Sequence, residues 1–302
     1  MAARPSPKRT SPRRSASRAS GRLGVALIGL GSLVLLAGCS AKDAFAFGWP
    51  KGITPQADQM YDLWIGSVVA ALAVGVFVWG LIFWCVVRYR KRGEELPAQT
   101  RYNMPIEVLY TVVPFLVIAV LFYYTAIIQT YVDKRSAKPD VTVDVVAFKW
   151  NWQFRYEGTQ DDTGATVSET GTSSYIPILV LPTGKKIRFK EESKDVIHSF
   201  WVPELLFKRD VMPGFDNQFE VTVRQPGEYV GRCAELCGTY HSMMNFEVRV
   251  VSPEKYQKYI ELRSQGTSTP DALEAIGYTG KERYAITTEP FNTKRDAARD
   301  KK

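Results

Sequence analysis

Side chains that bind soft metals are concentrated in one short stretch of this sequence. Residues 231–245 read GRCAELCGTYHSMMN and contain Cys233, Cys237, His241 and Met244 within a dozen positions. The only other histidine of the chain, His198, lies upstream in DVIHSFWVP. Thiolate, imidazole and thioether groups are the ligands that copper and zinc favour. The sequence therefore predicts a metal centre whose ligands come from two segments of the chain.

Simpler interpretations use only part of this ligand set. A disulfide between Cys233 and Cys237, which an extracytoplasmic location would permit, leaves His241 and Met244 without a role. Structural zinc prefers closely spaced cysteines with paired histidines and does not use methionine. A mononuclear blue-copper site needs only one cysteine, two histidines and a weak axial methionine. The second cysteine therefore favours two metals, while the disulfide and the zinc site remain less favoured alternatives.

The same residues resemble the copper A loop of cytochrome c oxidase subunit II, which has the pattern C-x-E-x-C-x-x-x-H-x-x-M with D-V-x-H-S upstream. Every ligand position of that pattern is matched in this sequence. The resemblance implies a binuclear copper centre bridged by the sulfurs of Cys233 and Cys237. His198 and His241 would each contribute one imidazole. Two bridging thiolates allow one electron to be shared by both metals, so that little rearranges when it arrives or leaves.

The weaker ligands and the surroundings of the centre also follow from the resemblance. Met244 and the backbone carbonyl of Glu235 would be the outer ligands of copper. The side chain of Glu235 would bind a magnesium ion shared with subunit I. Arg232 and Asp195 flank the ligands, and both are candidates for orienting them.

An export signal is predicted over residues 1–38. Seven basic side chains precede an apolar run at 23–36, which is too short to cross a bilayer and ends in LAGC. This ending resembles a lipoprotein cleavage box with Cys39 as the lipidated residue, and ordinary cleavage is the alternative. The formal charge of +8 falls to about +1 without this signal. The basic composition therefore does not indicate nucleic-acid binding.

Two membrane spans are predicted after an extracytoplasmic segment at 39–62. Residues 63–87 and 108–128 are apolar and long enough to form a hairpin of helices over 63–130. Pro114 inside the second span is tolerated in membrane helices. The loop at 88–105 has an excess of arginine and lysine, which places it in the cytoplasm. The mature N-terminus and the metal loop are then outside the plasma membrane.

Glu107 lies just inside the cytoplasmic end of the second span, in IEVLYTVVP. An interfacial carboxylate that reaches water is the simpler interpretation. The motif E-x-x-[WY]-T-x-x-P resembles the family, in which a glutamate here stands at the mouth of the proton path called the K-channel. The resemblance gives that role to Glu107.

Residues 131–252 are predicted to form an all-β domain. Residues 140–156 alternate apolar and polar side chains, and short strand-like runs follow at 178–181, 186–190, 199–202, 218–223, 227–232 and 246–251. This spacing suggests a Greek-key sandwich or barrel, and the resemblance implies the cupredoxin fold. The polar stretch 157–174 is predicted to be a surface loop that touches a partner. Residues 253–302 are predicted to form a helix followed by a charged tail.

Aromatic residues recur at every second position from Trp150 to Tyr156, so they are expected on one side of a strand. Trp152 is predicted to belong to the core. The family has an aromatic pair W-x-W here, whose first tryptophan accepts electrons from cytochrome c, and the resemblance gives this role to Trp150. The intervening residue is Asn151 instead of an aromatic one.

The resemblance implies that the chain accepts electrons from a cytochrome c-type donor and passes them to heme a of subunit I, where oxygen is reduced and protons are pumped. Oxidase subunits I and III are the expected partners. The chain has no Cys-x-x-Cys-His, so no heme is expected on it and the donor heme lies on another polypeptide. The donor could be a soluble cytochrome c or a tethered diheme cytochrome in a supercomplex with a cytochrome bc complex.

Three other classes of protein share parts of this pattern. A quinol oxidase subunit II has the hairpin and the fold but lacks the copper ligands. Nitrous oxide reductase has the copper loop but is longer and richer in histidine. A copper delivery or storage protein is the alternative that is not part of an enzyme.

Overall fold

The computed structural model describes residue 46 and residues 48–96 and 98–288. The predicted export signal, Cys39 and the end of the charged tail lie outside these residues. The chain divides into two compact units, Met1–Gly48 and Trp49–Lys302. The second unit contains the helical hairpin, the β domain and the predicted metal ligands.

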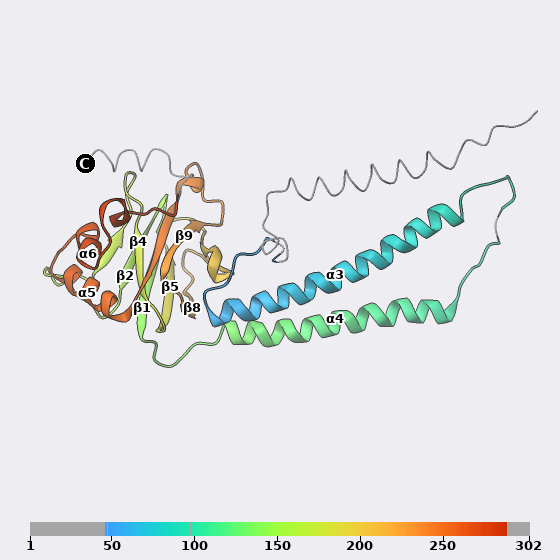
Figure 1. Cartoon of the computed structure of the whole chain (residues 1–302), viewed down its shortest axis with the longest axis horizontal. Helices are drawn as coiled ribbons and strands as arrows, with labels where there is room; N and C mark the ends of the chain where they lie inside the picture. Colours follow the sequence, from blue (N-terminus) through green and yellow to red (C-terminus); the bar gives the residue numbers. More distant parts are fainter. Residues whose placement is uncertain (1–45, 47, 97, 289–302) are drawn as a thin grey trace, which may run out of the picture. The chain divides into compact units, whose positions relative to one another are not determined.

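The hairpin consists of two long helices, α3 (Pro55–Arg88) and α4 (Met104–Val132) (Figure 1). The Thr54 side chain caps α3 by accepting a hydrogen bond from the Ala57 amide. At the start of α4, the Asn103 side chain accepts from the Ile106 amide, and the Glu107 side chain accepts from the Asn103 amide, so two amides at this helix end are satisfied by side chains. Both predicted spans are confirmed, and each helix continues beyond the predicted bounds.

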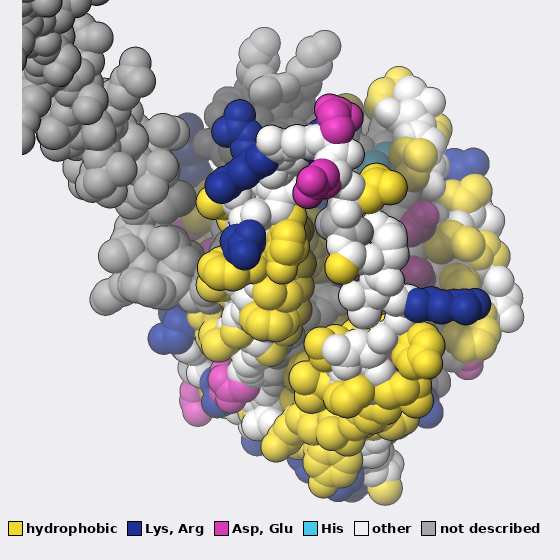
Figure 2. Space-filling view, turned by 90° about the vertical axis from the view of Figure 1, so that its right-hand side faces the viewer, with side chains coloured by type: hydrophobic (Ala, Val, Ile, Leu, Met, Phe, Trp, Pro, Cys, Tyr) yellow, Lys and Arg dark blue, Asp and Glu magenta, His cyan; other side chains and the backbone are white. Residues whose placement is uncertain are grey.

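Both helices are long and apolar enough to cross a membrane. Their most apolar stretches are not buried by any other described part of the chain. Hydrophobic side chains gather over a large part of the face shown in Figure 2. Lipid or neighbouring subunits must cover such a surface, because an apolar patch of this size is unfavourable in water.

The β domain is built from two five-stranded sheets. One has the strand order β3-β2-β1-β5-β8, and the other has the order β4-β10-β9-β6-β7. The strands are β1 (Val141–Phe148), β2 (Asn151–Tyr156), β3 (Ser168–Thr170), β4 (Ile178–Pro182), β5 (Lys186–Ser193), β6 (His198–Val202), β7 (Phe207–Val211), β8 (Asn217–Thr222), β9 (Gly227–Cys233) and β10 (Asn245–Val251). Parallel pairs β1–β5 and β4–β10 connect distant parts of the chain. The predicted sandwich is confirmed.

The core between the sheets is aromatic. Phe200 stacks on Phe246 with ring centroids 4.8 Å apart, and Trp152 meets both rings edge-on. Trp152 and Phe154 are fully buried on β2, as the alternation predicts. The expectation that Trp150 belongs to the same strand face is wrong. It lies in the turn before β2 and is only partly buried, because the chain reverses there between β1 and β2.

Two strands have no clear signal in the sequence. β7 contains Lys208, Arg209 and Asp210 in succession, so its apolar pattern is weak, and it lies at the edge of its sheet. β3 falls inside the predicted surface loop and has only three residues. Its central residue, Glu169, is buried and accepts a hydrogen bond of 2.5 Å from the Tyr175 hydroxyl.

The residues after the sandwich pack back against it. The helices α5 (Pro253–Ser264) and α6 (Thr269–Ala275) are followed by a short 3-10 helix η3 (Gly280–Arg283). Arg249 and Glu247 form a fully buried ion pair that also binds the backbone of residues 282–287. Arg249 donates to the Glu282 carbonyl, and Glu247 accepts from the Ile286 and Thr287 amides. The segment is thus anchored by its backbone, which composition does not reveal.

Both ends of the hairpin are joined to the β domain, the first by backbone hydrogen bonds and the second by an ion pair. The Ile53 amide donates to the Glu204 carbonyl of the 3-10 helix η1 (Pro203–Leu205), and the Ile53 carbonyl accepts from the Arg224 amide. Asp133, the C-cap of α4, pairs with Arg209 at 2.6 Å. These contacts tie both membrane helices to the domain that bears the predicted metal ligands.

Candidate metal centre

The predicted ligands lie at the ends of neighbouring strands and in the loop that joins them. His198 begins β6 and Cys233 ends β9, and these two strands pair, with Phe200 opposite Cys233. His241 begins the short 3-10 helix η2 (His241–Met243), and Met244 directly precedes β10. The sheet therefore brings His198 to the cysteine loop, although they are far apart in the sequence.

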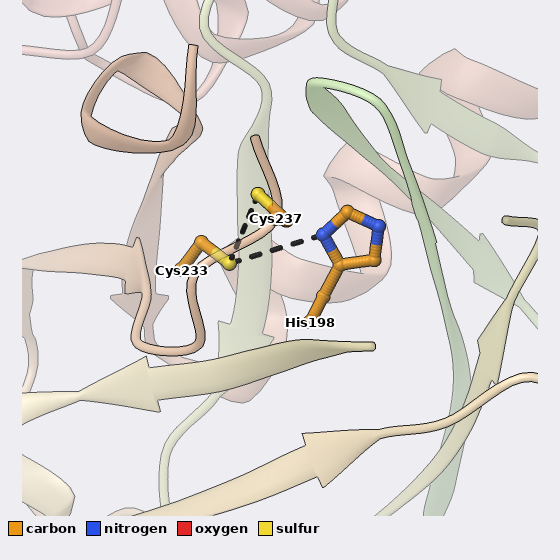
Figure 3. Close-up of side chains that lie close together, drawn as sticks. All are labelled: His198, Cys233 and Cys237. Atoms are coloured by element: carbon orange, nitrogen blue, oxygen red, sulfur yellow. Dashed lines mark hydrogen bonds between the residues drawn. The ribbon is translucent and has the colours of Figure 1, made fainter. Parts of the chain in front are cut away.

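The central donor atoms are close enough to share a metal. The Sγ atoms of Cys233 and Cys237 lie 3.9 Å apart, and the Cys233 Sγ is 3.9 Å from His198 Nδ1 (Figure 3). Ligand atoms of these three buried residues all lie within 4.8 Å of one another. A disulfide requires a sulfur separation of about 2.05 Å, so the cysteines are not joined.

The remaining predicted ligands surround the two sulfurs. His241 Nδ1 is 3.6 Å and Met244 Sδ is 3.8 Å from the Cys237 Sγ. The backbone carbonyl oxygen of Glu235 is 3.3 Å from the Cys233 Sγ. All six predicted donor groups therefore converge, with sulfur at the centre and nitrogen, thioether and carbonyl groups around it.

This donor set fits a copper pair. Burial, followed by the neighbouring Cys233, raises the pKa of the Cys237 thiol to about 12. A bound cation overcomes this penalty, because a metal deprotonates a coordinating thiol. His198 and Met244 are completely buried, whereas His241 is only partly buried. The His241 side of the centre is therefore the more accessible one.

Asp195 orients the imidazole of His198. One oxygen of Asp195 is 2.8 Å from His198 Nε2, which leaves Nδ1 facing Cys233. The other oxygen accepts a hydrogen bond of 2.7 Å from the Lys149 amide. Burial opposes ionisation of Asp195, but the hydrogen bond from His198 lowers its pKa overall. A negative Asp195 suits an imidazole whose other nitrogen binds a metal.

Two indoles hold the loops that carry the ligands. Trp150 Nε1 donates to the Cys237 carbonyl at 3.0 Å, and Trp152 Nε1 donates to the Met244 carbonyl at 3.2 Å. The bond of Trp152 was not anticipated, because burial of an indole in a core does not reveal its hydrogen-bond partner. The Trp150 ring also meets Tyr240 edge-on, with centroids 5.0 Å apart.

The other predicted residues lie outside this cluster. Arg232 directly precedes Cys233 and pairs with Trp201 and Asn245 in the sheet. Glu107 lies in the first turn of α4, at the end of the helix away from the β domain. Sequence reasoning overlooked Glu191, which is buried in β5 and has no hydrogen-bond partner for either carboxyl oxygen. A glutamate at an inward position of the strand was its only sequence signal.

Two stretches of the chain match known protein families. Residues 141–251 match the family described as cytochrome C oxidase subunit II, periplasmic domain, and residues 43–128 match the transmembrane domain of the same subunit. The periplasmic domain of cytochrome oxidase subunit II from Bradyrhizobium japonicum, a solved structure, is 26% identical and has a TM-score of 0.39, covering 44% of this chain and 100% of that one.

Curated relatives match along most of the chain. A probable cytochrome c oxidase subunit 2 of Nocardia farcinica is 46% identical, over 87% of this chain and 85% of that protein. Cytochrome c oxidase subunit 2 of Mycobacterium bovis is 44% identical, over 88% of each protein. The matches to both domains of the subunit and this degree of identity lead to one conclusion: the chain belongs to the cytochrome c oxidase subunit II family.

Proposed function

We propose that His198, Cys233, Cys237, His241, Met244 and the Glu235 carbonyl hold the copper A centre that the family implies. The convergence of these six donor groups around two sulfurs is the observation that carries the proposal. Copper bound here supplies one-electron redox chemistry between a donor outside the membrane and heme a of subunit I. The protein contributes four buried ligand residues, His198, Cys233, Cys237 and Met244, and two that are partly buried, Glu235 and His241.

Trp150 is proposed as the residue where electrons enter. Its indole donates to the carbonyl of Cys237, so a ring that is partly exposed is bonded directly to the ligand loop. Asp195 and Trp152 are proposed to position His198 and Met244, because they bond to the imidazole and to the Met244 carbonyl. The donor is proposed to be a cytochrome c-type protein on a separate polypeptide, since this chain has no heme-attachment motif. It would approach the side of the centre on which Trp150 lies.

The remaining roles concern the other subunits. The Glu235 side chain is proposed to bind magnesium at the border with subunit I, and subunit III is a further expected partner. Glu107 is proposed to receive protons at the cytoplasmic end of α4 for the K-channel. Lipidation of Cys39 stays a prediction, which mass spectrometry of the purified chain can test. A residue 39 without an acyl group would contradict it.

The optical spectrum of the purified protein tests the copper assignment. We expect the purple spectrum of a mixed-valence copper pair, and we expect Cys237→Ser to abolish it because one of the two cysteine thiolates that would hold the metals is lost. Cys85→Ser is the matched control, because Cys85 lies in α3 outside the cluster, and it should leave the spectrum unchanged. A blue mononuclear spectrum or a colourless zinc protein from the wild-type chain would contradict the proposal.

A further inference from the structure

The two membrane helices leave a groove of about 690 Å³ between them. Its lining runs from Gln59 to Ala70 on α3 and from Leu116 to Ile128 on α4. The β domain follows the end of α4 and lies outside the membrane, so the start of α3 and the end of α4 are the outer ends of the hairpin. The groove therefore opens in the outer leaflet of the membrane.

Small residues of α3 create the hollow. Gly66 has no side chain, and no atom lies within 4 Å of the position that a Cβ would occupy there. Ser67 and Ala70 belong to the same wall. The Ser67 hydroxyl donates a hydrogen bond of 2.7 Å to the Leu63 carbonyl of its own helix, so its polarity is already satisfied. This wall therefore offers an occupant empty space and little polarity.

The opposite wall is aliphatic and open to the membrane. Leu116, Val117, Val120 and Leu121 of α4 form it. Leu116 and Val120 remain 56% and 55% exposed. The groove is thus continuous with the apolar surface that both spans present to the membrane. A polar occupant would give up its hydrogen bonds with water and meet only aliphatic side chains on this wall, so the occupant must be apolar.

The other polar residues of the lining are confined to the outer end of the groove. Gln59 and Asp62 lie within the first eight residues of α3, and Tyr124 lies within the last nine residues of α4. The deeper part is lined by the small and aliphatic residues already described. A polar end that faces outward and an apolar end towards the middle of the bilayer match the two ends of a phospholipid.

The length of the groove distinguishes a lipid chain from a transmembrane helix. From Gln59 to Ala70 the helix rises ~17 Å, at about 1.5 Å per residue. The hydrocarbon layer of one leaflet is ~15 Å, which is half of the bilayer core. A transmembrane helix of another subunit would need a groove through both leaflets, whereas α3 continues to Arg88 beyond the lining. An acyl chain needs only one leaflet.

We propose that this groove binds one acyl chain of a phospholipid from the outer leaflet, with the lipid headgroup beside Gln59 and Asp62. The chain fills the space over Gly66 and packs α3 against α4 at the end of the hairpin that is joined to the β domain. The lipid is then a bound component of the oxidase, distinct from the bulk bilayer.

Filling the groove tests this proposal. Gly66→Leu places an apolar side chain in the empty space. Gly80→Leu is the matched control, because Gly80 is an equally open glycine of α3 outside the lining and the change in helix propensity is the same. Wild type and both variants are purified as the complete oxidase. Each is placed in nanodiscs of phosphatidylethanolamine and phosphatidylglycerol that contain a trace of phospholipid with a photoreactive acyl chain.

Mass spectrometry of peptides after illumination locates the label. We expect it to be concentrated in residues 63–70 and 116–121 of the wild type and of Gly80→Leu. In Gly66→Leu the label in these residues should fall about tenfold, because a close-packed groove has no room for both the new side chain and the acyl chain. An unchanged copper spectrum in both variants shows that the β domain is intact.

Three outcomes would overturn the proposal. Equal labelling of residues 63–70 in Gly66→Leu and wild type would show that the groove holds no chain. Label spread evenly around α3 would indicate bulk lipid only, and a wild-type lining without label would show that another subunit covers the groove. The last two outcomes are read from the wild type alone, so they decide the proposal even if Gly66→Leu does not assemble.

Discussion

At the scale of single residues, two acidic side chains of the β domain differ in how many hydrogen-bond partners they have. Asp195 has three hydrogen-bond partners, and this suits its task of holding His198. Glu191 has none, although it is 1% exposed. A buried carboxylate without partners is strongly unfavourable, so Glu191 keeps its proton.

The stability of the domain should therefore depend on the protonation of Glu191. Burial, only partly offset by the charge of Arg209, raises the pKa of Glu191 from 4.5 to about 9. Because the folded state holds this proton more tightly than the unfolded chain, its contribution is fully present below pH 4.5 and is lost as the pH rises towards 9. Glu191→Gln should flatten this dependence and raise stability at pH 8 by at least ~1 kcal/mol.

Thermal unfolding at several pH values, followed by tryptophan fluorescence, measures this effect. Glu192→Gln is the control, since Glu192 is adjacent but points outward and pairs with Arg155 at 3.2 Å. The control should keep the wild-type pH dependence. Parallel curves for wild type and Glu191→Gln would show that Glu191 is not the group responsible.

At the scale of secondary-structure elements, the centre depends on how closely β9 and β10 pack. Gly231 lies opposite Phe246 in the antiparallel pair, and a Cβ at Gly231 would lie 2.0 Å from the Phe246 ring. Phe246 is fully buried among Trp152, Phe154 and Phe200, so it has no free space to move into. The glycine is required here by a close approach and not by its backbone conformation.

Gly231→Ala should accordingly destabilise the domain and disturb the copper centre. We expect a loss of about 1–3 kcal/mol, typical of overpacking, together with weaker copper binding because Cys233 and Met244 flank this contact. Unfolding temperature and copper content measure the two effects. Gly93→Ala, in the loop between the helices with no atom within 4 Å of its Cβ, should change neither. A Gly231→Ala protein with wild-type stability would contradict this account of the packing.

At the scale of the whole molecule, the family places the β domain outside the membrane and the loop between α3 and α4 inside. The predicted metal centre and Glu107 therefore lie on opposite sides of the membrane. Glu107 is bonded to the Asn103 amide at the start of α4, so its carboxyl is held at the cytoplasmic end of the helix.

This separation leads to a prediction about Glu107. Glu107→Gln should slow turnover and proton uptake several-fold, while reduction of the copper centre by the donor stays at the wild-type rate. Stopped-flow absorption and a pH indicator on the oxidase in vesicles follow the two processes. Glu95→Gln, in the loop that precedes α4, is the control and should match the wild type. Unchanged turnover and proton uptake in Glu107→Gln would remove the proposed role.

The sequence by itself determined the chemistry of this protein and the order of its parts. Ligand types and spacings at 231–245 indicated a soft-metal centre, and uninterrupted apolar runs indicated two spans, because both signals are local. Most strands were also predicted, from the alternation in residues 140–156 and from the short strand-like runs that follow it. These features depend on residues that are close in sequence, so no tertiary information was needed.

The tertiary structure decided what depends on contacts between distant segments. It placed Trp150 in a turn instead of a strand, and it bonded Trp152 to the Met244 carbonyl. It also joined Asn151 to the 171–173 turn and folded residues 276–288 onto β10. The physical reason is common to all four, because hydrogen bonds and packing between residues far apart in the chain leave no periodic pattern in the sequence.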